Sequence, residues 1–274
     1  MRKILKWGVT LLVILATLTG AYLGWLYWRM HATSTQDEVV TATPPAPVKS
    51  PPQEVKPEVL HPLVAPEAPA VATTTLDNSD DIFTAFVASL FADHKLPDFI
   101  IPERMLRRFV ATVDNLPRKE LAARIRPIKP VPGMFIAEKQ GETLSISLQN
   151  EARYARYVNA LEAIDVTALV KFYASHYGLF QKAYQELGYP KANFNDRLFE
   201  AIDDLLDTPQ VQPPVMLVQP KVVYLYADSS LENRSAGQKI MLRMGADSSL
   251  RVKAVLKKIR AELQRYDTTH QTAS

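Results

Sequence analysis

VTALVKFYASHYGLFQKAYQEL, residues 166–187, carries apolar or aromatic side chains on nearly every face of the helix that its spacing predicts. Asp165 is a suitable N-cap before it, and Gly188 is a suitable stop after it. A helix without a polar face is normally the buried centre of its domain. We therefore expect one long central helix here, with the rest of a domain packed around it.

Further helices are predicted on both sides of this centre. Asn78 or Ser79 can cap a helix that begins with Asp80 and Asp81, and Pro102 is well placed to open the next. Helical spacing and capping residues predict four more, beginning at Asn150, Asp196, Ser235 and Ser248. The last of them should end near Tyr266.

Strand signals are fewer. Phe135–Lys139 and Thr143–Leu148 flank Gln140-Gly141, which is typical of a hairpin. Two short β-rich runs follow at Val215–Val218 and Val222–Tyr226. The fold class is therefore α+β, a mostly helical domain over residues 76–267 with a small antiparallel sheet, followed by a disordered tail over 268–274.

The stretch WGVTLLVILATLTGAYLGWLYW, residues 7–28, contains no charge and is long enough to cross a bilayer. Arg2, Lys3 and Lys6 precede it, and basic flanks stay in the cytoplasm. We expect residues 1–6 in the cytoplasm, one transmembrane anchor over 7–28 in the inner membrane, and an exported, periplasmic C-terminal domain. A cleaved signal peptide is the alternative, but the apolar run is too long and no small-residue cleavage site follows it.

One face of this anchor carries small residues, Ala16, Gly20 and Gly24, at intervals of four. Small residues let two helices approach closely in lipid, so this face is a candidate for weak homodimer formation.

Residues 29–75 form a proline-rich segment without Phe, Tyr or Trp. Such a composition cannot bury enough apolar surface to fold, so we expect a disordered tether. It is either a passive linker, or a ligand for a proline-binding partner, or a spacer that crosses a cell-wall layer.

Composition limits the function classes. The net charge of +3 over 274 residues is too small for a nucleic-acid binder, and the absence of cysteine excludes disulfides. The five histidines lack metal-ligand spacing, and neither a phosphate-binding glycine loop nor a G-x-S-x-G motif occurs. The sequence therefore predicts no metal and no cofactor, and it identifies no catalytic residue.

Five stretches carry a family resemblance. They are DNLPRKELAARIRPIKPVPGMF (114–135), NEARYARYVNALEAID (150–165), AYQELGYP (183–190), AIDDLLDTP (201–209) and KIMLRMG (239–245). Together they resemble the bacterial family called domain of unknown function 3014, over about residues 78–265. The resemblance implies a single-pass membrane protein with an exported domain, and it implies no activity, cofactor or catalytic residue.

Two charged clusters are candidate partner-binding sites. Glu200, Asp203, Asp204 and Asp207 share one face of a predicted helix, where they repel one another and invite a cation or a basic partner. The basic candidates are Arg104, Arg107, Arg108, Arg124 and Arg126. The acidic cluster is either a solvated face or paired with the domain's own arginines, and the basic cluster either pairs with it or docks to anionic lipid or cell-wall polymer.

The expected function is therefore a membrane-anchored envelope protein whose exported domain is a binding or scaffold module for an envelope protein or a cell-wall partner. The alternative is an envelope enzyme that acts on a cell-wall or lipid substrate. A clustered polar cleft would favour the enzyme, and a broad exposed apolar patch would favour the module.

Overall fold

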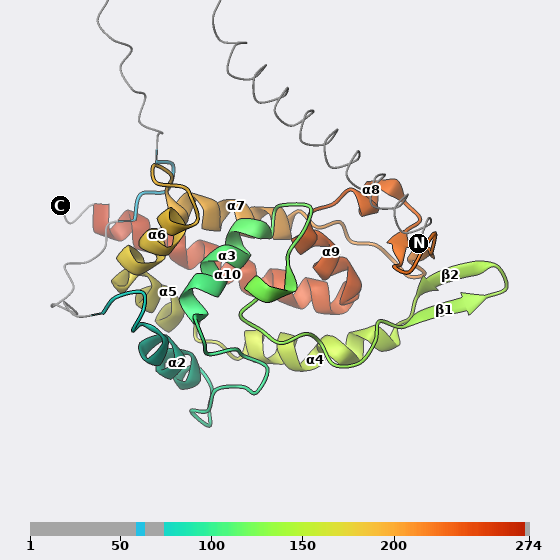
Figure 1. Cartoon of the computed structure of the whole chain (residues 1–274), viewed down its shortest axis with the longest axis horizontal. Coiled ribbons are helices and arrows are strands. Elements are labelled where there is room, and N and C mark those ends of the chain that lie inside the picture. Colours follow the sequence, from blue (N-terminus) through green and yellow to red (C-terminus); the bar gives the residue numbers. More distant parts are fainter. Residues whose placement is uncertain (1–58, 64–73, 272–274) are drawn as a thin grey trace, which may run out of the picture. The chain divides into compact units, whose positions relative to one another are not determined.

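The computed structural model describes residues 59–63 and 74–271, with side chains up to Tyr266 (Figure 1). The predicted residues 1–6, the anchor over 7–28 with Ala16, Gly20 and Gly24, and most of the tether lie outside this part of the chain. Within it, no helix is both long enough and apolar enough to cross a membrane.

Two helices occupy the centre of the domain where one was expected. They are α5 (Val166–Ser175), capped by the Asp165 side chain as predicted, and α6 (Tyr177–Glu186). His176 separates them with φ −114° and ψ 13°. Its backbone N–H is shared between the carbonyls of Phe172 and Tyr173, and its Nδ1 donates to Phe172 O at 2.9 Å. The prediction of one continuous helix was wrong because these bonds tighten the turn and end α5.

The main hydrophobic core forms where three further helices pack around this pair. They are α3 (Met105–Asn115), α7 (Phe194–Leu206) and α10 (Ala246–Gln271). Helix α10 packs against α5 and α7, and α3 packs against α6 and α7 (Figure 1). The largest side chains with almost no exposure in this core are Phe194, Phe199, Leu106, Leu263, Val110 and Val170. The apolar stretch 166–187 thus lies at the domain centre, as its composition predicts.

The predicted strands join in one antiparallel sheet of order β1-β2-β3-β4. The strands are β1 (Ala137–Gln140), β2 (Thr143–Ile146), β3 (Met216–Val218) and β4 (Leu225–Tyr226). Leu144 pairs with Leu217, which pairs with Tyr226 on the other side. Together with Leu231 and Leu242, the buried Leu217 and Tyr226 form a second, smaller core. The mostly helical α+β class with a small antiparallel sheet is confirmed for the described residues.

The remaining helices are α2 (Asp80–Ser89), α4 (Gln149–Glu162), α8 (Ser229–Glu232) and α9 (Ala236–Arg243), with a 3₁₀ turn at Ala123–Ile125. Several capping predictions differ from the structure. Neither Asn78 nor Ser79 caps α2 with its side chain, and Asn150 lies inside α4, where it bonds both backbone groups of Ile136. Helix α10 continues through residues 268–271, into the predicted tail.

Residues 59–63, which fall within the predicted disordered tether, pack against the domain. Leu63 is only 9% exposed and belongs to the main core. The His61 ring stacks on Phe199 of α7 with a centroid distance of 3.9 Å. The tether prediction was based on the composition of the whole segment. Composition does not show that the Leu63 side chain and the His61 ring pack against the core and bind residues 59–63 to the domain.

Candidate functional site

The acidic face of α7 is largely paired within the domain. Asp203 accepts two hydrogen bonds from Arg260 of α10, at 2.6 and 3.2 Å, and Glu200 lies 2.5 Å from Arg197 of its own helix. Asp204 accepts a hydrogen bond from the Ser235 hydroxyl at 2.6 Å. Only Asp207, at the C-terminal end of α7, is exposed without such a contact among the described residues. The pairing interpretation therefore holds for Asp203 and Glu200, but with arginines that the sequence analysis did not name.

Asp204 should make the domain's stability depend on pH. Burial raises the pKa of its carboxyl; the Ser235 hydroxyl opposes this, and the charges of Asp207 and Glu200 reinforce it. An acid whose pKa rises on folding stabilises the fold below its unfolded pKa, and this contribution is lost as the pH rises through the folded pKa. The variant Asp204→Asn, which can still accept from Ser235, should therefore melt at a higher temperature than the wild type at about pH 7, and the difference should vanish near pH 3.

Thermal melts of both proteins across this pH range measure the effect. The variant Asp207→Asn is the matched control, because it removes an exposed carboxylate and should give a smaller gain. A lower melting temperature for Asp204→Asn at about pH 7 would contradict the assignment.

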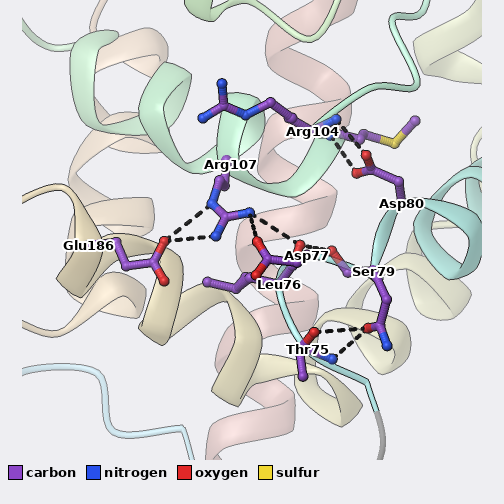
Figure 2. A network of polar contacts seen from close by, with 10 residues as sticks. Thr75, Leu76, Asp77, Ser79, Asp80, Arg104, Arg107 and Glu186 are labelled. Carbon is purple, nitrogen blue, oxygen red and sulfur yellow. Dashed lines mark hydrogen bonds and ion pairs between the residues drawn. The ribbon is translucent and has the colours of Figure 1, made fainter.

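The arginines of α3 take part in structural contacts between α2, α3 and α6 (Figure 2). Arg107 pairs with Asp77 at 2.9 Å and with Glu186 at 3.1 Å. The carboxylate of Asp80 accepts the backbone N–H groups of Arg104 and Met105, so it caps α3 across a long stretch of chain. The guanidinium of Arg104 points away from this network (Figure 2).

Arg108 connects α3 to the loop that follows it. Its guanidinium donates to the carbonyls of Arg124 and Arg126, at 2.5 and 3.2 Å. Among the described residues, none of the five candidate arginines contacts the acidic face of α7. The expectation that the two clusters pair with each other was therefore wrong, because α3 presents its arginines to α2, α6 and its own loop.

An open cleft of about 500 Å³ lies between this loop and α9. Four of its lining residues are cations, Lys119, Arg126, Lys239 and Arg243, and one is an acid, Glu120. The others are Asn115, Leu121, Ala122, Ala236 and Ile240. Four positive charges and one negative charge give the lining a net charge of +3, in a chain whose total is also +3.

Glycine at position 237 brings the two sides of the cleft together. The backbone N–H of Gly237 donates to Leu116 O at 2.9 Å, and that of Ala236 donates to Arg118 O at 2.6 Å. A Cβ atom at Gly237 would lie 2.7 Å from Leu205 Cδ2 and 3.2 Å from Leu116 O. A larger residue would crowd these atoms, so glycine favours the close approach of the loop to the first turn of α9.

Three of the four cations have no carboxylate partner among the described residues. Lys119 donates only to the carbonyl of Asn233. Arg126 donates through Nη2 to Leu121 O at 2.9 Å, while its Nε is buried without a hydrogen-bond partner. Lys239 alone is neutralised, by Glu232 at 3.1 Å. Carbonyl groups satisfy donors but do not cancel charge, so the cleft keeps a positive potential.

The groups behind the cleft do not remove this potential. The Tyr226 hydroxyl donates to Lys239 O at 3.3 Å, and burial raises its pKa to about 12 although the nearby charge of Arg243 opposes this. Burial also raises the pKa of Tyr154, which is close enough to Arg126 and Arg243 to sense their charges. Both hydroxyls therefore stay neutral at physiological pH and leave the arginines cationic.

A family model described as a protein of unknown function (DUF3014) matches residues 105–260, more than half of the chain. The chain belongs to the DUF3014 family. No curated protein and no solved structure matches it. The resemblance stated from the sequence is thus confirmed.

The stretches that carry the DUF3014 resemblance also line the cleft. Residues 114–135 and 239–245 supply every lining residue except Ala236. Of the candidates named from the sequence, only Arg126 belongs to this DUF3014 cleft; Lys119, Lys239 and Arg243 were missed. The resemblance itself was the signal that could have pointed to them.

The described part of this DUF3014 protein contains no cluster of metal-ligating side chains. Among residues 59–63 and 74–271, no three His, Asp or Glu side chains gather as metal ligands. The described chemistry of the cleft is that of an anion site: guanidinium and ammonium donors around an open concave surface.

Proposed function

We propose that this DUF3014 protein is a membrane-anchored envelope protein whose exported domain is a binding or scaffold module, and that the basic cleft is its binding surface. The anchor is proposed from the uncharged stretch 7–28 and its basic N-terminal flank. One observation carries the binding role: Arg126 and Arg243 line an open concave surface without carboxylate partners among the described residues. Such a surface suits the carboxylate or phosphate groups of an envelope partner.

A polar cleft is the feature expected of an enzyme, but the residues that line this one support binding better than catalysis. Its lining includes one carboxylate, Glu120, whereas glycoside hydrolysis generally uses a pair. The lining holds no serine, threonine, cysteine or histidine to act as a nucleophile with a base. An envelope enzyme remains the second candidate, but no geometric feature of the cleft favours it.

The test measures binding of the full chain, reconstituted in nanodiscs of neutral lipid, to three probes: polyglutamate, inorganic polyphosphate and vesicles containing phosphatidylglycerol. The double variant Arg126→Gln/Arg243→Gln should weaken binding of at least one probe about tenfold or more, because charge-assisted hydrogen bonds are lost. The preferred probe distinguishes a carboxylate polymer, a phosphate polymer and a lipid surface.

The matched control is Lys257→Gln/Lys258→Gln, which removes the same charge from the exposed face of α10. An equal loss of affinity in the control would reduce the effect to general electrostatics and would overturn the cleft assignment. Unchanged melting temperatures would show that both variants are folded.

In cells, a periplasm-dependent reporter fused after Ser274 should be active, and activity of a cytoplasm-dependent reporter would reject the anchor orientation.

A further inference from the structure

The first turn of α7 holds the backbone of residues 60 and 61 with two side chains. The carboxylate of Asp196 accepts the N–H groups of Leu60 at 3.3 Å and of His61 at 2.7 Å. The carboxamide of Asn195 donates to the carbonyl of His61 at 3.0 Å. These are contacts to main-chain groups, so they hold this stretch through its backbone.

Two side chains complete the contact. The His61 ring lies over Phe199 at 3.9 Å with an interplanar angle of 16°, and Leu63 enters the main core. The other side chains contribute little, because Val59 is 40% exposed and Leu60 is 70% exposed. The segment 59–63 is thus held by one ring, one leucine and three hydrogen bonds.

The receiving site is built by α5, α6 and α7 rather than by the segment itself. Asn195 is fully buried and its Oδ1 accepts a hydrogen bond from the Tyr173 hydroxyl at 3.0 Å. The backbone N–H of Asn195 takes no part in holding the segment, because it donates to Oδ1 of Asn193, the N-cap of α7, at 2.9 Å. Asp196 lies in the first turn of α7, where a carboxylate is stabilised whether or not the segment is bound.

Detachment of the segment would therefore leave few groups unsatisfied. The Asp196 carboxylate is only partly buried and can be hydrated. Asn195 keeps its bond to Tyr173, and Phe199 remains under the guanidinium of Arg260, 5.6 Å from the ring centroid. The losses are the burial of Leu63, the stacking of His61 on Phe199 and the acceptor of the buried Asn195 carboxamide, against a gain in conformational entropy of the released chain.

We propose that Asn195, Asp196 and Phe199 form a docking site for residues 60–63 that is occupied reversibly, so that the domain adjusts the length of its own tether. This use of the site rests on the proposed membrane anchor, whereas the docking itself does not. Release would move the first attachment of the chain to the domain from residues 60–63 to residue 74, and so lengthen the connection between bilayer and domain. The cleft could then engage a partner farther from the membrane.

The test uses spin labels, because the chain has no cysteine of its own. Labels at Leu60→Cys and Gln185→Cys, both exposed positions, report the distance from the segment to α6 in the full chain in nanodiscs. We expect a narrow distance distribution for the docked state with a minor, broad component. Asp196→Ala should raise the ratio of released to docked chain at least about tenfold, because both backbone N–H groups lose their charged acceptor.

Asp207→Ala is the matched control, since it removes a carboxylate from the other end of the same helix. A broad distribution in the wild type, or one that Asp196→Ala leaves unchanged, would overturn the docking proposal. Equal release in the Asp207→Ala control would also overturn it. A short-distance component that decreases when labelled chains are mixed with unlabelled chains in larger nanodiscs would instead assign the site to the segment of a second copy. Because these readouts do not use the cleft, they can fail while the proposed binding function stands, and the reverse is also true.

Discussion

Replacing Asp114 with alanine should lower the free energy of unfolding by about 3–5 kcal/mol, the loss expected when one partner of a buried ion pair is removed. The Asp114 side chain is only 6% exposed. It accepts a hydrogen bond from Arg118 at 3.0 Å and lies 3.2 Å from Nε of Arg197, whose side chain is 13% exposed. Without the carboxylate, the Arg197 cation would remain buried beside backbone carbonyls and Glu200 alone.

The geometry explains why charge rather than hydrogen bonding dominates this contact. Arg197 Nε lies close to Asp114 Oδ1 but is not aligned to donate to it, and it has no other hydrogen-bond partner among the described residues. The Nη2 atom of Arg197 donates instead to the backbone carbonyl of Asp114. This pair joins α3 to α7 directly beside the loop that forms one wall of the cleft.

Urea denaturation of the detergent-solubilised full chain measures the effect, with Asp114→Asn as the control. The asparagine keeps the acceptor for Arg118 but removes the charge, so its loss should fall between the wild type and the alanine variant. A loss below about 1 kcal/mol for Asp114→Ala would place the pair in the class of exposed ion pairs and contradict its buried role.

The sequence predicted the parts of the fold that depend on local patterns. The apolar composition of 166–187 identified the domain centre, and Gln140-Gly141 between alternating residues identified the hairpin, where Gly141 has a φ of +61°. The break at His176 was missed because it depends on a side-chain bond to a carbonyl, which leaves no trace in hydrophobic periodicity.

The cleft and the docked segment escaped prediction for a different reason. Lys119 and Arg126 are more than a hundred residues from Lys239 and Arg243, and only the close approach at Gly237 brings them together. Leu63 is one of several aliphatic residues scattered among prolines, and its local sequence does not distinguish it from those that stay outside the core. Long-range packing decided both outcomes.

The acidic face of α7 shows how far charge patterns can be interpreted. Spacing correctly placed Glu200, Asp203 and Asp207 on the polar side of an amphipathic helix, opposite the buried Ile202. The partners were decided by the arginines that lie next to these carboxylates in the fold: Arg197 of α7 for Glu200 and Arg260 of α10 for Asp203. A basic cluster elsewhere in the sequence carried no information about this.

The variant Phe199→Ala should lower the free energy of unfolding by about 3–5 kcal/mol, the range for truncating a buried phenylalanine. Phe199 is 1% exposed and contacts both the core and the ring of His61. Phe199→Leu keeps most of the volume and should cost less, about 1.5 kcal/mol or below. Urea denaturation of the detergent-solubilised full chain provides both values.

A double-mutant cycle with His61→Ala separates the core contribution of Phe199 from its contact with the docked segment. If His61 stacks on Phe199 in solution, the two losses should fall short of additivity by about 0.5–1.5 kcal/mol, the coupling expected for an aromatic pair. Additive losses would mean that the two rings are not coupled in solution and would contradict the stacking. Phe199→Ala also removes the ring from the docking site, so it should raise the released fraction in the spin-label experiment. Phe194→Ala is the control, because Phe194 is equally buried and its ring packs on Phe180 and Tyr184. This control should destabilise the domain and leave the released fraction unchanged.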